Sequence, residues 1–378
     1  MSFKPLSNAL FALRAHLRAR APAVPKKDVP KMKIAMTKLR ATSLPILILA
    51  ICSLAFAQQQ KPTPDPAAVT GDEVVRVETT LITVPVSVMD RQGRFIADLQ
   101  KTDFHLFEGN VEQEIAFFET ADKPFTVALV LDMSESTEFK LKEIQDAANG
   151  FLAQLRPEDR VIIVAFDKGV YVLAEPTSDR GILSRAIGRT RTGGGTSLYS
   201  AIDRVMGDEL SRVSGRKAIV LFTDGVDTSS SDSTYQSTLR TAEELDALAY
   251  AIQYETYDDA VSSKSGRGAG DQDARGILVT AKGESLEAAY KRADRYLNLL
   301  ADKTGGRYFL AASPKSLKES FERIAQELRH QYSLGFYPQT RAAGKSRQLK
   351  VRVNRPDVAV RARKSYIYKG PSDAREQK

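Results

Sequence analysis

Alternating apolar and polar residues mark two separate stretches of the chain. The first runs from Val74 to Phe118 and is broken by turn residues at Arg91–Gly93. The second begins near residue 331 and contains the segments QYSLGFY, RQLKVRV and KSYIY. A period of two residues is typical of half-buried antiparallel strands. Because the few strands of the first stretch would bury little surface alone, we expect the two stretches to form one β-sandwich.

Between these stretches, continuous apolar runs alternate with helical periodicity. Phe125–Leu131 lacks polar alternation, as expected of a strand covered by helices on both faces of a sheet. Apolar residues then recur at helical spacing from Leu141 to Leu155. Further strands are predicted at Val161–Phe166, Val170–Ala174 (an edge strand), Ala218–Phe222, Ala247–Tyr254 and Arg307–Ala311, and further helices at Leu198–Leu210, Thr234–Leu245, Ser285–Lys303 and Leu317–His330. This order predicts an α/β fold with a doubly wound, mostly parallel sheet, flanked by the β-sandwich.

Changes in composition divide the chain further. The polar, Pro-rich sequence after residue 57 is typical of a linker. Residues 257–283 interrupt the strand and helix order with a sequence rich in Gly, Ser and charge, which we interpret as a flexible insert. The predicted segments are a targeting segment at 1–57, a linker at 58–71, a β-rich segment at 72–120, the α/β domain at 121–330, a second β-rich segment at 331–369 and a tail at 370–378.

The N-terminal segment has the features of an export signal. Basic residues from Lys31 to Arg40 precede the apolar run Leu44–Phe56, and the small residues around Phe56 fit cleavage after Ala57. The run is shorter than the roughly 20 residues of a membrane span, so membrane association is expected only if this segment is retained. The sequence therefore predicts an exported protein, located in the periplasm, at the cell surface or outside the cell.

The charge and cysteine content narrow the functional classes. The formal net charge is +8, but residues 1–57 hold ten Lys or Arg and one acidic residue. The remaining 45 basic and 46 acidic residues nearly cancel, so no nucleic-acid partner is expected. The single cysteine, Cys52, lies in the predicted signal. After cleavage the chain would lack disulfides, Cys-ligated zinc and a thiol nucleophile.

Three loops carry the candidate chemistry. The sequence Asp132–Ser136 (DMSES) directly follows a predicted strand, a glycine-rich loop ending at Thr196 precedes a predicted helix, and Thr223–Gly225 (TDG) ends another strand. The carboxyl ends of parallel strands share one edge of the sheet, where such folds bind ligands. Oxygen ligands without His or Cys select Mg²⁺, Ca²⁺ or Mn²⁺ over zinc or copper. The candidate metal ligands are Asp132, Ser134, Ser136, Thr196 and Asp224.

These motifs resemble the metal-ion-dependent adhesion site (MIDAS) of von Willebrand factor A (VWA) domains, over roughly residues 124 to 312. The flanking β-rich sequences also resemble a bacterial, acidobacterial-type family of exported proteins with a VWA domain between β-rich segments. The resemblance implies that Ser134, Ser136 and Thr196 bind the ion directly, and that Asp132 and Asp224 bind it directly or through water. It also implies that a Glu or Asp of a protein partner completes the coordination. The nearby Asp227 and Glu135 are interpreted as solvated rim charges.

An enzymatic function is less favoured. A Mg²⁺-dependent phosphatase resembling haloacid dehalogenases would use Asp132 as its nucleophile and a second acid two residues later, where this chain has Ser134. The motifs G-x-S-x-G, H-E-x-x-H and the P-loop are absent from the sequence.

The sequence therefore predicts a non-enzymatic, exported module that binds an acidic residue of a protein partner through Mg²⁺, or through Mn²⁺ or Ca²⁺. A structural envelope protein, whose cation only fastens its own loops, is the alternative. An exchangeable cation would favour the binding module, and a buried, saturated one the structural role.

Overall fold

The computed structural model describes residues 80–120, 123–135, 140–258, 260–262, 277–280, 282–339 and 343–369. All of them belong to the second of two compact units, which spans Val74–Lys378. The predicted signal, the linker, the tail and most of the predicted insert lie outside the described residues, as does Ser136. Within the described part of the chain, no helix is both long and apolar enough to span a membrane.

A six-stranded sheet forms the centre of the α/β domain. Its strand order is β10-β9-β8-β5-β6-β7, and all neighbours are parallel except β6 and β7. The predicted fold class, with a mostly parallel doubly wound sheet, is confirmed, and the predicted edge strand lies at the edge. The bounds are β5 Phe125–Asp132, β6 Arg160–Phe166, β7 Val170–Thr177, β8 Arg216–Thr223, β9 Leu248–Tyr254 and β10 Arg307–Ala311.

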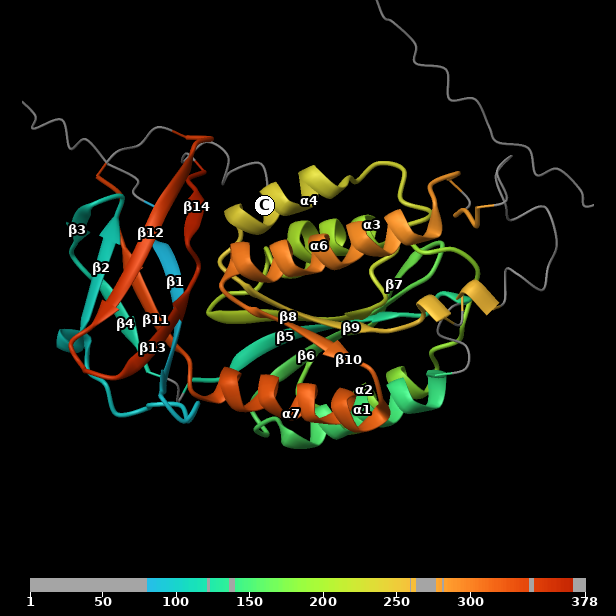
Figure 1. The fold of residues 1–378 in the computed structure, drawn as a ribbon. Coiled ribbons are helices and arrows are strands. Elements are labelled where there is room, and N and C mark those ends of the chain that lie inside the picture. Colours follow the sequence, from blue (N-terminus) through green and yellow to red (C-terminus); the bar gives the residue numbers. More distant parts are fainter. Residues whose placement is uncertain are drawn as a thin grey trace, which may run out of the picture. The chain divides into compact units, whose positions relative to one another are not determined.

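Helices cover both faces of this sheet, as Figure 1 shows. One face carries α1 (Leu141–Gln154), α2 (Arg180–Gly188) and α7 (Pro314–Arg329), and the other carries α3 (Leu198–Arg204), α4 (Tyr235–Glu244) and α6 (Leu286–Thr304). Each face has its own cluster of buried apolar side chains. All eight residues of β5 are buried because the strand contributes alternate side chains to the two clusters.

Three helices differ from the sequence prediction at the level of local structure. α2 was not predicted, since its nine residues give a periodic pattern of only about two turns, although the Asp179 side chain caps it by accepting from the Ile182 amide at 3.0 Å. α3 ends at Arg204 and passes into a π-helical turn, Val205–Glu209, where one continuous helix was expected. α7 begins three residues earlier than predicted because Ser313 caps it and Pro314 occupies its first turn.

Two four-stranded antiparallel sheets form a β-sandwich. Its strands come from the parts of the described chain that precede and follow the α/β domain. Their orders are β13-β1-β11-β4 and β14-β12-β2-β3, so each sheet mixes strands that precede and follow the α/β domain, as predicted. The two sheets share one apolar core. The bounds are β1 Ile82–Asp90, β2 Phe104–Glu108, β3 Val111–Gln113, β4 Phe117–Glu119, β11 Tyr332–Phe336, β12 Ser346–Val353, β13 Val358–Ala362 and β14 Ser365–Ile367, with a 3-10 turn at Lys101–Asp103 before β2.

Buried charges join this β-sandwich to the α/β domain. Arg363, between β13 and β14, donates to the backbone oxygens of Glu243, of Leu245 at 3.1 Å and of Ser365 at 2.9 Å. Glu327 of α7 accepts from Arg361 at 2.8 and 2.9 Å. Buried charges of this kind are tolerated only when their hydrogen-bonding capacity is met. The two junction contacts therefore hold the sandwich against α4 and α7.

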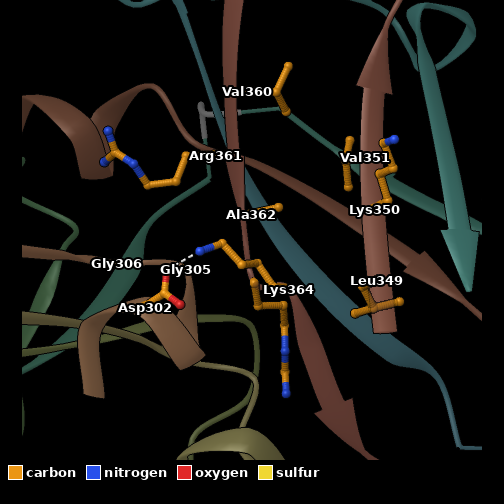
Figure 2. A pocket seen from close by; sticks show the side chains of 11 residues that line it. Asp302, Gly305, Gly306, Leu349, Lys350, Val351, Val360, Arg361, Ala362 and Lys364 are labelled. Carbon is orange, nitrogen blue, oxygen red and sulfur yellow. Dashed lines mark hydrogen bonds and ion pairs between the residues drawn. The ribbon is translucent and has the colours of Figure 1, made fainter. Parts of the chain in front are cut away.

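A cavity of about 380 Å³ lies at this junction, between the turn Gly305–Gly306 and strands β12 and β13. Figure 2 shows the Lys364 side chain reaching Asp302 across it, and these groups are 2.5 Å apart. Gly306 immediately precedes β10, so the cavity lies at the amino end of the parallel strands. It is therefore separate from the edge at which the candidate ligands were predicted.

Arg363→Met is expected to lower the free energy of unfolding by about 3 kcal/mol, because three buried carbonyl groups lose a charged donor. Urea unfolding of the full chain measures this change. Lys350→Met, an exposed position of β12, is the control and should change stability by less than about 0.5 kcal/mol. Equal losses for the two variants would contradict a role of Arg363 at the junction.

Candidate metal site at the carboxyl edge of the sheet

Asp132 is the last residue of β5, and its side chain is fully buried. One carboxylate oxygen accepts from the Ser134 amide at 2.9 Å, and the other from the Thr223 hydroxyl at 2.6 Å. Strand register explains the second contact: Leu131 pairs with Phe222, so the next residue of each strand meets at the sheet edge. The two donors hold the carboxylate in one orientation.

The glycine-rich loop is fastened beside the Asp132 loop. The Gly193 amide donates to the Met133 carbonyl at 2.8 Å, and Ser134 and Gly193 form an isolated parallel bridge. A Cβ atom on Gly193 would lie 2.0 Å from a carboxylate oxygen of Asp167, so no larger residue fits there without rearrangement. A larger residue at position 193 would therefore have to displace the side chain of Asp167, which follows β6.

Thr196 is tied in turn to the loop that follows β8. Its carbonyl accepts from the amides of Thr228 and Ser229, both at 2.9 Å, and its amide donates to the Thr228 hydroxyl at 2.9 Å. Asp224, in the same loop, is also buried and accepts from the Val226 amide and the Thr256 hydroxyl, both at 3.0 Å. A positive φ of 86° at Gly225 permits the sharp turn after Asp224.

The structure thus brings Asp132, Ser134, Thr196 and Asp224 to the carboxyl edge of the sheet, on three loops joined by hydrogen bonds. The fifth candidate, Ser136, lies outside the described residues. No group of three or more His, Cys, Asp or Glu side chains placed to hold a metal occurs among the residues that the structure describes. The predicted set is of another kind, because it combines two carboxylates with hydroxyl groups.

The two carboxylates affect each other. Burial, and then the negative charge of Asp224, raise the pKa of the Asp132 carboxyl to about 7 from its usual 3.8, although hydrogen bonds from Ser134 and Thr223 act in the opposite direction. Two neighbouring buried carboxylates repel when both are ionised. A divalent cation that prefers oxygen ligands fits the negative charge of these two carboxylates and the oxygen atoms beside them.

The interpretation of Asp227 as a solvated rim charge is wrong. Asp227 is buried rather than solvated: its carboxylate accepts from the Tyr199 amide at 3.3 Å and the Ser230 hydroxyl at 2.5 Å, and pairs with Lys282 at 2.8 Å. Asp227 therefore fastens the start of α3 to the loop after β8. Glu135 is exposed, as expected of a rim residue.

Two hydroxyl groups that contact the candidate ligands were not singled out from the sequence. Thr223 stands next to Asp224 in the T-D-G motif, and its position at the end of β8 was the available signal. Thr256 is distant in sequence from the other site residues and follows β9, the neighbour of β8. Only the strand order places it beside Asp224.

Comparison with known proteins supports a VWA domain in this chain. Residues 127–227, less than half of the chain, match the family model described as von Willebrand factor type A domain. This range includes all five candidate ligands. No curated protein matches the chain in sequence.

Several solved structures are similar to it. A von Willebrand factor type A protein from Catenulispora acidiphila is 12% identical, with 73% of this chain and 77% of that chain covered and a TM-score of 0.43. An aerotolerance-related membrane protein from Bacteroides fragilis is 15% identical, with 54% and 98% covered and a TM-score of 0.39. The vWF domain of the type V pili tip protein Mfa5 from Porphyromonas gingivalis is 14% identical, with 54% and 94% covered and a TM-score of 0.40. Likenesses of this size do not establish a shared activity or partner.

The raised pKa of Asp132 predicts a pH-dependent stability when EDTA is present. The folded state holds the proton more tightly than the unfolded state, whose carboxyl titrates near 3.8. The contribution of the neutral carboxyl is therefore complete below pH 3.8 and is lost as the pH rises through about 7. Urea unfolding between these pH values should show the wild type losing stability relative to Asp132→Asn, whose amide stays neutral. A constant difference between the two proteins would refute the shift.

Proposed function

We propose that this chain is a non-enzymatic protein-binding module that holds a divalent cation, Mg²⁺ or alternatively Mn²⁺ or Ca²⁺, and engages a Glu or Asp side chain of a partner protein. The proposed ligands are Asp132, Ser134, Ser136, Thr196 and Asp224. The observation that carries the proposal is the pairing of two buried carboxylates, Asp132 and Asp224, with hydroxyl-bearing loops at the ligand-binding edge of the sheet. The similarity to VWA domains supports the same assignment.

The proposed ligands contribute two kinds of oxygen atom. Ser134 and Thr196 supply neutral oxygens, and Asp132 and Asp224 supply negative charge. A bound cation would offer a coordination position to an outside carboxylate, since Mg²⁺ prefers six oxygen ligands. Hydrogen bonds from neighbouring threonines fix the proposed ligands: Thr223 orients Asp132, Thr256 orients Asp224, and Thr228 holds the Thr196 backbone. A prearranged set of this kind lowers the entropic cost of binding.

An exported location fits this proposal. The N-terminal segment has the composition of a secretory signal, and the matched structures include a pilus tip protein. A protein that carries its binding edge outside the cytoplasm would meet partner proteins there. The partner is therefore proposed to be an exported or surface protein that presents an acidic residue. Nucleic acid is not a proposed partner, because residues 58–378 carry nearly balanced charge.

The metal site is tested by removing one ligand atom without changing shape. Thr196→Val should weaken Mg²⁺ binding, measured by isothermal titration calorimetry, by at least about tenfold, because one hydroxyl ligand is replaced by a methyl group. Thr241→Val on α4 removes a hydroxyl group that bonds only within its helix, to the Ser237 carbonyl, and should leave the affinity unchanged. Mg²⁺ binding by the Thr196 variant equal to that of the wild type would exclude Thr196 as a ligand.

Partner capture separates the binding function from its alternatives. Capture of envelope proteins by the wild type should require Mg²⁺ and disappear with EDTA and in Thr196→Val. A cation that EDTA cannot remove from the folded protein would instead support the structural role. Turnover of a phosphate monoester that Asp132→Asn abolishes would support the phosphatase.

A further inference from the structure

The outer edge of β10 is open in the described structure. β10 stands at one end of the six-stranded sheet, and no described strand pairs with its outer side. In Figure 1 the strand lies beneath α6 at this edge. Edge strands present rows of backbone N–H and C=O groups that can pair with another chain. Leu310 on this strand is 55% exposed.

A groove of about 890 Å³ runs between β10 and one flank of α6. We call it the β10 groove. Its apolar and aromatic wall includes Tyr257, Tyr290, Leu299 and Leu310. The α6 residues that line it run from Tyr290 to Asp302, which span about 18 Å at the rise of an α-helix. The five residues of β10 span about the same length in extended conformation. The groove therefore matches a short extended segment lying along the strand.

The β10 groove ends beside the candidate metal site. The Tyr290 hydroxyl lies 2.7 Å from the Thr256 hydroxyl, and Thr256 donates to Asp224 at 3.0 Å. One groove-lining side chain is thus connected to a proposed ligand through a single threonine. The end of the groove at Tyr257 and Tyr290 therefore lies at the carboxyl ends of the parallel strands, whereas its other end reaches Asp302. A single partner segment is therefore able to contact the cation and continue into the groove.

The charges along the groove indicate which side chains the segment carries. Lys291 is paired with Glu287 at 2.5 Å, Asp294 accepts from the Tyr308 hydroxyl at 2.9 Å, and Asp302 is paired with Lys364. Glu255, which also lines the groove, is exposed. Arg295 is exposed and has no carboxylate partner among the described residues. An acidic side chain of the occupant complements this arginine, whereas apolar side chains complement Leu310 and the tyrosines.

We infer that the β10 groove binds an extended segment of the same partner protein, added as a further strand to β10, with apolar side chains turned into the groove and an acidic side chain facing Arg295. This inference rests on the proposed function, because it assigns the segment to the partner whose carboxylate meets the cation. Backbone pairing supplies affinity in this mode of recognition, and the alternate side chains supply specificity.

The test uses random peptides displayed on phage and selected on the immobilised full chain in Mg²⁺. Selected peptides should combine acidic residues with alternating apolar residues. Leu310→Lys should lower the affinity for a selected peptide by roughly tenfold, because an apolar contact is lost. Fluorescence anisotropy measures this affinity. Ile182→Lys is the matched control, because Ile182 is 44% exposed on α2 in the opposite helix layer, and it should have no effect.

Two further measurements locate the peptide. Hydrogen exchange should show peptide-dependent protection of backbone amides in β10. Arg295→Glu should lower the affinity for the peptide. Replacing the facing acidic residue of the peptide by Lys should restore that affinity in the variant. Peptides whose affinity is unchanged by Leu310→Lys, or that leave the β10 amides unprotected, would overturn the inference. A concentration-dependent dimer that Leu310→Lys abolishes would also overturn it, in favour of pairing with a second copy of the chain.

The outcomes also separate the groove from the metal site. Peptide binding that needs Mg²⁺ but tolerates Leu310→Lys would preserve the proposed function and reject the groove. Peptide binding that protects β10 equally in the wild type and in Thr196→Val would support strand addition at the groove and reject its connection to the cation.

Discussion

The complete burial of β5 is the constraint on which the candidate site depends. Helices on both faces of the sheet bury every residue of this strand, so its last residue, Asp132, enters the edge of the site without contact with solvent. A buried carboxylate needs hydrogen-bond donors or an opposite charge. Ser134 and Thr223 supply the donors, and Asp224 adds a second negative charge nearby. This pairing of two buried carboxylates is the basis of the proposed cation site.

The β-sandwich is closed by strands from both sides of the α/β domain in the sequence. β1 pairs with β11 and β13, and β2 pairs with β12, so neither half of the sandwich can complete its sheets alone. The buried Arg363 and Glu327 then connect the sandwich to α4 and α7. The candidate metal site lies at the other, carboxyl end of the parallel strands, and the β10 groove extends from that end as far as Asp302, which also lines the junction cavity.

Much of the fold could be predicted because it follows from patterns within short segments. Continuous apolar runs identified the buried strands, and alternation identified the sandwich strands except β13, which was not predicted. The helices that differ from the prediction have local causes. α2 is too short for a long periodic pattern, and the helix after Thr196 changes to a π-helical turn at Val205. Asp227 was interpreted as a rim charge because its position in sequence does not reveal its burial. Its partners, Tyr199 and Lys282, come from other parts of the chain.

The sequence by itself determined most of the strands and helices in their order along the chain. It also determined the chemistry of the candidate ligands and the strand ends on which they lie. These properties depend on local periodicity and on residue type. Only the tertiary structure decided that Thr256 contacts Asp224, that Asp227 is buried and that β10 leaves an open edge beside α6. Those features depend on which strands become neighbours, and that choice is made by long-range packing between segments that carry no local signal of one another.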